Sequence, residues 1–157
     1  MAVPDDGMAP ASPDPQDLAR RAAEAMWAED TACRSLDMSI EDVRPGKAVL
    51  AMAIKAHMVN GHGICHGGYI FLLADSAFAY ACNSHNQRAV AQHCMVTYLK
   101  PGRLGDRLLA VAVERTREGR NGICDVTVTR ADGTKIAEFR GFSRTIEGRL
   151  VAEQPQG

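Results

Sequence analysis

A single carboxylate interrupts the most apolar stretch of the sequence. Asp75 stands between Tyr69 and Cys82, where nearly every other side chain is apolar or small. The residues three and four positions away are apolar, so no cation on the same helix face could neutralise it. A mid-helix Asp can cap a turn or face solvent, but burying an unpaired carboxylate is costly. An acid in this setting therefore points to a functional site, where it would serve as general base or nucleophile.

Two glycines, Gly67 and Gly68, stand at the expected start of this helix. The first N–H groups of a helix have no internal acceptor, and that end carries partial positive charge. A backbone without side chains also lets a ligand approach closely. The pattern fits a carbonyl oxygen that becomes negatively charged during a reaction; a plain glycine-rich loop is the alternative.

The spacing between Asp75 and Gly67 predicts a shared site. Asp75 follows Gly67 by eight residues, which is about 12 Å along one helix. Within a single chain, therefore, Gly67 and Asp75 cannot both reach the same reacting carbonyl. If both serve the same site, the protein is a two-fold dimer with two sites, each built from both chains.

The loop before the helix is rich in His and Cys, but its spacing does not indicate a metal site. His57, His62, Cys65 and His66 lie close together in the sequence, yet HxxCH is not a usual zinc spacing and no CxxC pair is present. The same loop fails the dinucleotide pattern GxGxxG, because His66 takes the third glycine position. Cys65 is a possible nucleophile, although a small apolar filler is the simpler interpretation. We expect no bound metal.

Patterning predicts one long helix and a mostly antiparallel sheet. A first helix is expected over 15–29 and the long apolar helix over about 68–83, the latter buried on all faces. Alternating residues and short turns predict five or six strands, over 36–43, 47–54, 89–99, 107–117, 123–130 and 134–146. This is an α+β domain whose sheet wraps around the long helix.

Composition bounds the domain and its surroundings. We expect a disordered tail at 1–13, one domain at 14–147 and a second tail at 148–157. The net charge of −1 argues against a nucleic-acid partner. No apolar window approaches the length of a membrane span, and the N-terminus does not read as a signal peptide. The five cysteines form no disulfide pattern, so the prediction is a cytoplasmic protein without membrane or nucleic-acid partners.

Four motifs together carry a family resemblance. They are N-G-H-x-x-C-H-G-G, L-A-D-x-A-F-A-Y-A-C-N-S, L-K-P-G-x-x-G-D and F-R-G-x-S, between residues 60 and 143, and the resemblance as a whole runs over about residues 15–146. The sequence resembles the hotdog-fold acyl-CoA thioesterases of the phenylacetate degradation pathway. The resemblance implies a hotdog fold, homodimers often paired into homotetramers, an acyl-CoA substrate such as phenylacetyl-CoA or its ring-hydroxylated relatives, and no cofactor.

The resemblance also implies roles for particular residues. Asp75 takes the position of the catalytic acid, and Asn60 that of the asparagine which orients the thioester or the attacking water. Gly67 matches the glycine whose N–H polarises the thioester carbonyl, and His66 is the histidine beside it. Related enzymes often carry a Ser or Thr on the strand after the helix, where this sequence has Ala91 or Gln92; we place Gln92 among the substrate-binding residues.

Further substrate contacts are expected around the start of the helix and the K-P-G turn. Gly68 and Tyr69 would contact the substrate, while Lys100 and Arg103 would hold the coenzyme A phosphates. Phe71, Phe78 and Tyr80 are further wall candidates, and Arg140 and Arg144 further cations. The alternatives are a thioesterase of broader aryl or medium-chain specificity, a non-catalytic acyl-CoA-binding protein on the same fold, and a structural dimerisation protein.

Overall fold

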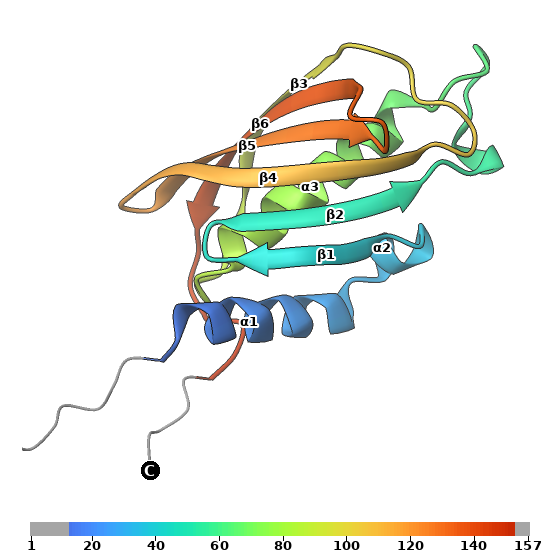
Figure 1. Ribbon diagram of the computed structural model, residues 1–157. Coiled ribbons are helices and arrows are strands. Elements are labelled where there is room, and N and C mark those ends of the chain that lie inside the picture. The colour runs from blue at the N-terminus through green and yellow to red at the C-terminus, as the bar shows by residue number, and fades with distance from the viewer. Residues whose placement is uncertain (1–12, 153–157) are drawn as a thin grey trace, which may run out of the picture.

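A computed structural model describes residues 13–152, and its centre is an antiparallel sheet around one helix (Figure 1). The sheet has six strands in the order β1-β2-β4-β5-β6-β3, with every neighbouring pair antiparallel. The strands are β1 Ser39–Arg44, β2 Lys47–Ala53, β3 Ala89–Tyr98, β4 Arg107–Glu118, β5 Asn121–Arg130 and β6 Lys135–Thr145. The strand number and pairing confirm the sheet that the alternating pattern predicts.

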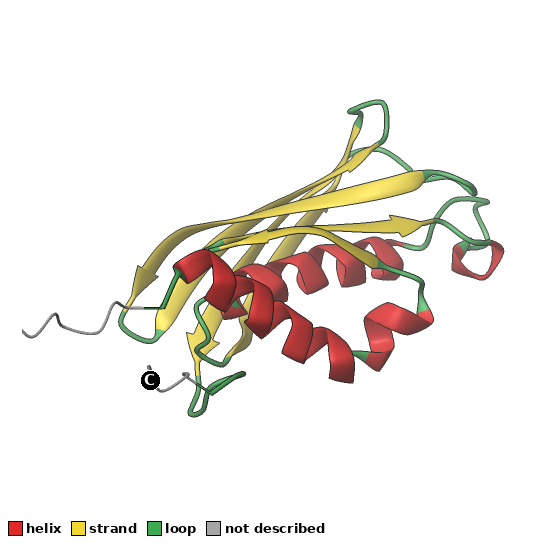
Figure 2. Ribbon diagram, turned by 60° about the horizontal axis from the view of Figure 1, so that its bottom comes forward, coloured by secondary structure: helices red, strands yellow, loops and turns green. Residues whose placement is uncertain are grey.

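The long helix α3, Gly67–Asn83, packs along the inner face of this sheet. Figure 2 shows α3 and the first helix on the same side of the strands. Phe78 of α3 is buried and lies 5.8 Å, between ring centroids, from Phe139 of β6. A Cβ on Gly141 would stand 2.6 Å from the Phe78 ring. The glycine of F-R-G-x-S therefore lets the helix approach the sheet.

Helix α1, Pro15–Glu29, has the bounds that the sequence predicts. A short helix that was not predicted, α2 at Thr31–Ser35, follows it. The Asp30 carboxylate starts α2, because it accepts hydrogen bonds from the Cys33 N–H at 2.9 Å and from the Tyr80 hydroxyl at 3.0 Å. The strand expected from residue 36 therefore begins only at Ser39.

One stripe of α3 stays open in the single chain, so the prediction of burial on all faces is wrong at this level. Leu72, Asp75 and Ala79 recur every three to four residues on one side of the helix and are each half-buried. The sheet and α1 cover the other sides, where Leu73, Ala77 and their neighbours are fully buried. A single six-stranded sheet covers part of the helix circumference and leaves this stripe available.

Strand β3 forms one edge of the sheet, and the apolar surface gathers there. The exposed large hydrophobic side chains among the described residues are Val90, Met95, Tyr98, Leu99 and Leu104, all on β3 or in the segment that follows it. An edge strand also presents unpaired N–H and C=O groups. This combination marks the edge as a surface that a further strand can cover.

The described part of the predicted C-terminal tail is attached to the domain. The buried Asn86 side chain accepts hydrogen bonds from the N–H groups of Leu150 and Val151, and donates to the Val151 carbonyl oxygen at 2.9 Å. Residues 1–12 and 153–157 lie outside the described range, and the domain limits at 14 and 147 stay predictions. Within residues 13–152, no helix has the length and apolarity needed to span a membrane.

Candidate active site

The loop before α3 is folded around Asn60. The Asn60 Oδ1 accepts a hydrogen bond from the His62 N–H at 2.9 Å, and the Asn60 N–H donates to the Ile64 carbonyl oxygen at 2.8 Å. In the described part of the chain the Asn60 Nδ2 has no hydrogen-bond partner. The turn therefore holds the amide by its oxygen and leaves its donor group for a ligand.

His66 caps the N-terminus of α3. Its Nδ1 accepts a hydrogen bond from the Gly68 N–H at 2.9 Å, which fixes both the imidazole and the first turn. The N–H of Gly67, the first residue of the helix, makes no hydrogen bond within residues 13–152. His66 and Gly68 are therefore engaged with each other, and the unpaired donor at this helix end is that of Gly67.

Tyr98, at the end of β3, lies over Gly67 and was not recognised from the sequence. Its hydroxyl donates a hydrogen bond to the Gly67 carbonyl oxygen at 2.8 Å. A Cβ on Gly67 would stand 2.9 Å from the Tyr98 Cζ, so this position accommodates no side chain without moving the ring. The signal that could have found Tyr98 is its place just before the K-P-G turn.

A cavity of about 510 Å³ opens beside these groups. It brings together three of the predicted residues, Asn60, Gly67 and Lys100, with Tyr98 and apolar neighbours; its lining is Asn60, Ile64, Cys65, Gly67, Ile70, Tyr98, Leu99, Lys100 and Pro101. Its walls come from the loop, the first turns of α3 and the K-P-G turn. The Cys65 N–H donates to the Gly102 carbonyl oxygen at 2.8 Å and joins the loop to that turn.

Other predicted substrate residues do not line this cavity. The Tyr69 ring contacts the His57 ring, with centroids 6.1 Å apart. Arg103 is exposed, and its N–H donates to the Asp106 carboxylate at 2.9 Å. Gln92 is exposed on β3 at an irregularity in the register with β6, between the pairs of Ala91 and His93. A residue inserted in this way can turn its side chain off the normal alternation.

Asp75 lies outside the cavity, on the open stripe of α3. The one hydrogen bond to its carboxylate among the described residues comes from the Cys94 thiol of β3, with Sγ 3.7 Å from Oδ1. Burial raises the pKa of Asp75 and the Cys94 contact opposes that rise. A half-buried acid without a cation suits a general base, because its basicity exceeds that of a solvated carboxylate.

The remaining wall candidates pack in or beside the core, and one of the two further cation candidates forms an ion pair. Phe78 and Tyr80 are almost fully buried among core residues, whereas Phe71 is half-buried and contacts the Phe139 ring at 5.5 Å between centroids. Arg140 binds the Asp125 carboxylate at 2.6 Å from β6 to β5. The apolar periodicity of α3 does not distinguish wall residues from core residues, and the structure places Phe78 and Tyr80 in the core.

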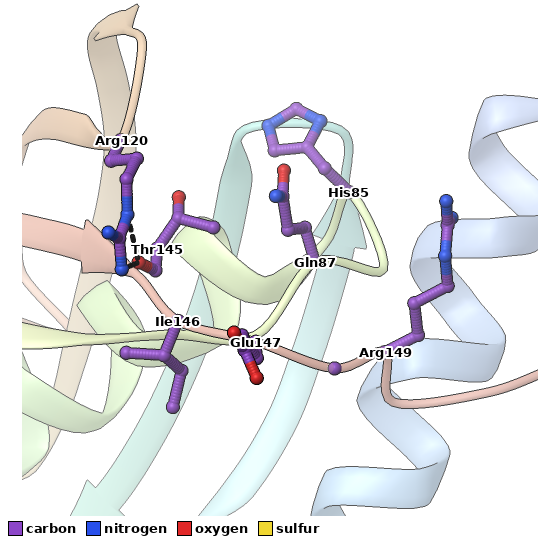
Figure 3. A pocket seen from close by; sticks show the side chains of 8 residues that line it. His85, Gln87, Arg120, Thr145, Ile146, Glu147 and Arg149 are labelled. Atoms are coloured by element: carbon purple, nitrogen blue, oxygen red, sulfur yellow. Dashed lines mark hydrogen bonds between the residues drawn. The ribbon is translucent and has the colours of Figure 1, made fainter.

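A second cavity of about 510 Å³ lies near the C-terminal end of α3 (Figure 3). Its mostly polar lining comes from the loop after α3, the turn between β4 and β5, the end of β6 and the C-terminal segment, and includes His85, Arg120 and Glu147. It contains none of the predicted site residues.

Among residues 13–152, no three His, Cys, Asp or Glu side chains lie close enough together to hold a metal ion.

Comparison with known proteins decides the family. Residues 62–137 match the model of the thioesterase superfamily. The chain is 41% identical, over 131 residues, to the acyl-coenzyme A thioesterase PaaI of Escherichia coli; the match covers 83% of this chain and 94% of that protein. The chain belongs to the thioesterase superfamily. The resemblance seen in the motifs is thereby confirmed.

Solved structures place this thioesterase in the hotdog fold that the sequence predicts. The structure of E. coli PaaI, from the phenylacetic acid degradation operon, matches with a TM-score of 0.85 at 40% identity, covering 87% of this chain and 99% of that one. A Streptococcus mutans protein bound to acetyl-CoA matches with a TM-score of 0.69 at 27% identity, covering 71% and 90%.

Proposed function

We propose that the protein is an acyl-CoA thioesterase that hydrolyses phenylacetyl-CoA or its ring-hydroxylated relatives to the free acid and coenzyme A. The observation that carries this proposal is that α3 presents two reactive groups. One is the N–H of Gly67 at its N-terminus, which has no partner in the described chain, and the other is the half-buried carboxylate of Asp75 on its open stripe. The identity to E. coli PaaI supports the substrate class.

The cavity at the start of α3 receives the thioester carbonyl. The Gly67 N–H and the Asn60 Nδ2 are its unpaired donors, and both line the same cavity. Hydrogen bonds and the helix dipole stabilise the negative charge that the carbonyl oxygen gains when it is attacked. His66 acts indirectly, since its Nδ1 fixes the first turn through the Gly68 N–H.

Asp75 activates the attack. As general base it removes a proton from water, the oxygen bonds to the carbonyl carbon, and the carbon–sulfur bond breaks to release coenzyme A, whose sulfur takes up a proton. As nucleophile its carboxylate oxygen bonds to the carbonyl carbon and the carbon–sulfur bond breaks, so that coenzyme A leaves and takes up a proton; water then hydrolyses the mixed anhydride to the free acid and the Asp75 carboxylate. Both routes need water as the only co-substrate, so we propose no cofactor.

The two halves of the site come from different subunits. On α3, Gly67 and Asp75 are about 12 Å apart along the axis. Tyr98 contacts Gly67 and Cys94 contacts Asp75, and these two strand residues are about 13 Å apart along β3. Helix α3 and strand β3 therefore run antiparallel, and the two contacts are separated by nearly the same distance along each element. Gly67 lies level with Tyr98, and Asp75 lies level with Cys94.

This geometry supports one arrangement of the proposed dimer. If Asp75 of a second copy meets Gly67, then Cys94 of that copy lies level with Tyr98. The two β3 edges then run antiparallel, with Val96 near the two-fold axis. This places Gln92 of the second copy level with Lys100, beside the cavity, and covers the exposed apolar side chains of the β3 edge.

The surroundings of the enzyme are proposed on the same basis. All five cysteines are free thiols, which suits a reducing cytoplasm.

Lys100, at the cavity wall, and Arg103, on the same turn, would attract the coenzyme A phosphates. We also propose that two dimers pair into a homotetramer. Gly68 and Tyr69 would contact the acyl chain, at the junction of the two subunits.

The test is thiol release from phenylacetyl-CoA, hydroxyphenylacetyl-CoA, benzoyl-CoA and straight-chain acyl-CoA, with wild type and Asp75→Asn in parallel. We expect rapid turnover of the arylacetyl esters by wild type and a loss of at least about a hundredfold in the variant. Equal turnover of all esters would indicate a broader specificity. Tight binding without turnover in either protein would indicate an acyl-CoA-binding module.

A further inference from the structure

The Cys94 thiol is the one polar side chain of another element that contacts the Asp75 carboxylate within the described residues. Cys94 is on β3 and half-buried, and its Sγ lies 3.7 Å from the Asp75 Oδ1, within the range for a sulfur hydrogen bond. It forms no part of the cavity around Gly67. We propose that Cys94 is a positioning residue, which binds one oxygen of Asp75 and directs the other toward the reacting water or carbonyl. This inference rests on the proposed function of Asp75.

The direction of the hydrogen bond follows from the protonation of the two groups. Burial and then the negative charge of Asp75 raise the pKa of the Cys94 thiol to about 11. The thiol therefore keeps its proton at neutral pH, and an ionised carboxylate has no proton to give. Cys94 donates, and the contact stabilises the charged form of Asp75 against the effect of burial.

The other groups facing Asp75 do not provide this contact. On α2, burial first of all, and least of all the nearby Asp75 charge, raises the pKa of the Cys33 thiol. That thiol, however, donates its hydrogen bond to the Ser76 hydroxyl at 3.2 Å. Ser76 in turn donates to the Leu72 carbonyl oxygen at 2.7 Å. No Lys, Arg or His of the described residues forms an ion pair with Asp75. Its orientation therefore depends on Cys94.

A thiol suits this position for a physical reason. A thiol is a weak donor and carries no charge, so it can hold a carboxylate oxygen without removing the basicity that burial confers. An Arg or Lys in the same place would depress the pKa of Asp75 strongly and weaken it as a base.

The experiment compares Cys94→Ala and Cys94→Ser with wild type in pH profiles of kcat for phenylacetyl-CoA. Without a donor, we expect kcat of Cys94→Ala to fall about tenfold, and the acid limb to move to higher pH by up to about one unit. Cys94→Ser keeps a donor, so its acid limb should lie at or below the wild-type position. Cys33→Ala serves as the matched control. It removes a buried thiol that is hydrogen-bonded to Ser76, the residue after Asp75, and should leave the acid limb of the kcat profile in place.

An infrared measurement separates this contact from the catalytic role of Asp75. The S–H stretching band that disappears in Cys94→Ala should shift to higher frequency in Asp75→Asn, because an amide accepts more weakly than a carboxylate. A shift supports the contact whether or not Asp75 is catalytic. A Cys94→Ala protein that is folded and has the wild-type acid limb, or a band unmoved in Asp75→Asn, would overturn the inference.

Discussion

Replacement of Asp75 by Asn is expected to abolish activity and, at the same time, to stabilise the fold. Loss of an acid/base group lowers kcat by at least about a hundredfold. The free energy of unfolding should nevertheless rise at neutral pH, because burial raises the pKa of Asp75. The folded state therefore holds the ionised carboxylate less favourably than the unfolded chain does.

The structure sets the size of this gain. A carboxylate has about four acceptor positions, and in the described chain Asp75 has one thiol donor at 3.7 Å and no cation. An uncompensated buried ion costs several kcal/mol, and Asp75 is half-buried and partly satisfied. Because an amide also needs partners, we expect a net gain of about 1 kcal/mol, or roughly 3 °C in Tm for a chain of this size.

The pH dependence provides the sign of the effect. An acid whose folded-state pKa is raised makes the fold less stable as pH rises from its unfolded pKa, about 3.9, through its folded pKa. Asn does not titrate, so the gain should be absent below about pH 4 and complete above the folded pKa of Asp75. Urea unfolding at equal protomer concentration measures this difference.

Asp125→Asn is the matched control, since the opposite environment surrounds that carboxylate. Hydrogen bonds from Arg140, and then from Arg115, lower the pKa of Asp125. The ionised Asp125 carboxylate stabilises the fold at pH values above the pKa that it has in the unfolded chain. This stabilisation is lost as the pH falls through the lower pKa that it has in the folded state. The variant should lose about 0.5–1 kcal/mol at neutral pH and keep its activity. An Asp75→Asn protein less stable than wild type at pH 7, or stabilised equally at pH 3 and pH 7, would refute the reasoning.

Three further variants test the other half of the site. Asn60→Asp keeps an oxygen for the His62 N–H but removes the Nδ2 donor, so kcat should fall about tenfold or more with little change in Tm; unchanged turnover would exclude Asn60 from the reaction. Gly67→Ala places a Cβ 2.9 Å from the Tyr98 ring, so we expect kcat/KM to drop at least about tenfold. Calorimetry should show that the free energy of unfolding falls by about 1 kcal/mol or less, which is the value of one exposed hydrogen bond. Lys100→Ala should raise KM a few-fold, and the difference from wild type should shrink at high salt; a salt-independent effect would contradict a role in binding phosphate.

Much of the fold could be predicted because its signals are local. The capped start of α1 at Pro15 and the alternating strands after residue 107 follow from period and turn chemistry. The short helix α2 escaped prediction because its stability comes from Asp30, which accepts from Tyr80 fifty residues away in the sequence. Tertiary contacts of this kind leave no periodic pattern.

The site was predictable in its residue types and less so in its contacts. The lone acid at Asp75 and the glycine at Gly67 stand out from the sequence, and their spacing predicts two subunits if both residues serve one site. Tyr98 and Cys94 were missed as partners of these residues, because an alternating strand does not reveal which of its residues will face a given turn of a helix. Their pairing across β3 and α3 appears only when both elements are placed.

A mixing experiment tests the shared site most directly. Asp75→Asn and Asn60→Asp homodimers each contain two defective sites. When the two proteins are unfolded together and refolded at equal amounts, about half of the dimers combine one chain of each kind. In these, one site has both its Asp75 and its Asn60 intact, and the other has neither. We predict recovery of about a quarter of the wild-type rate, and no recovery when Asp75→Asn is mixed with Asp75→Ala. A mixture as inactive as its two components would contradict the account, because it would mean that each site is built within one chain.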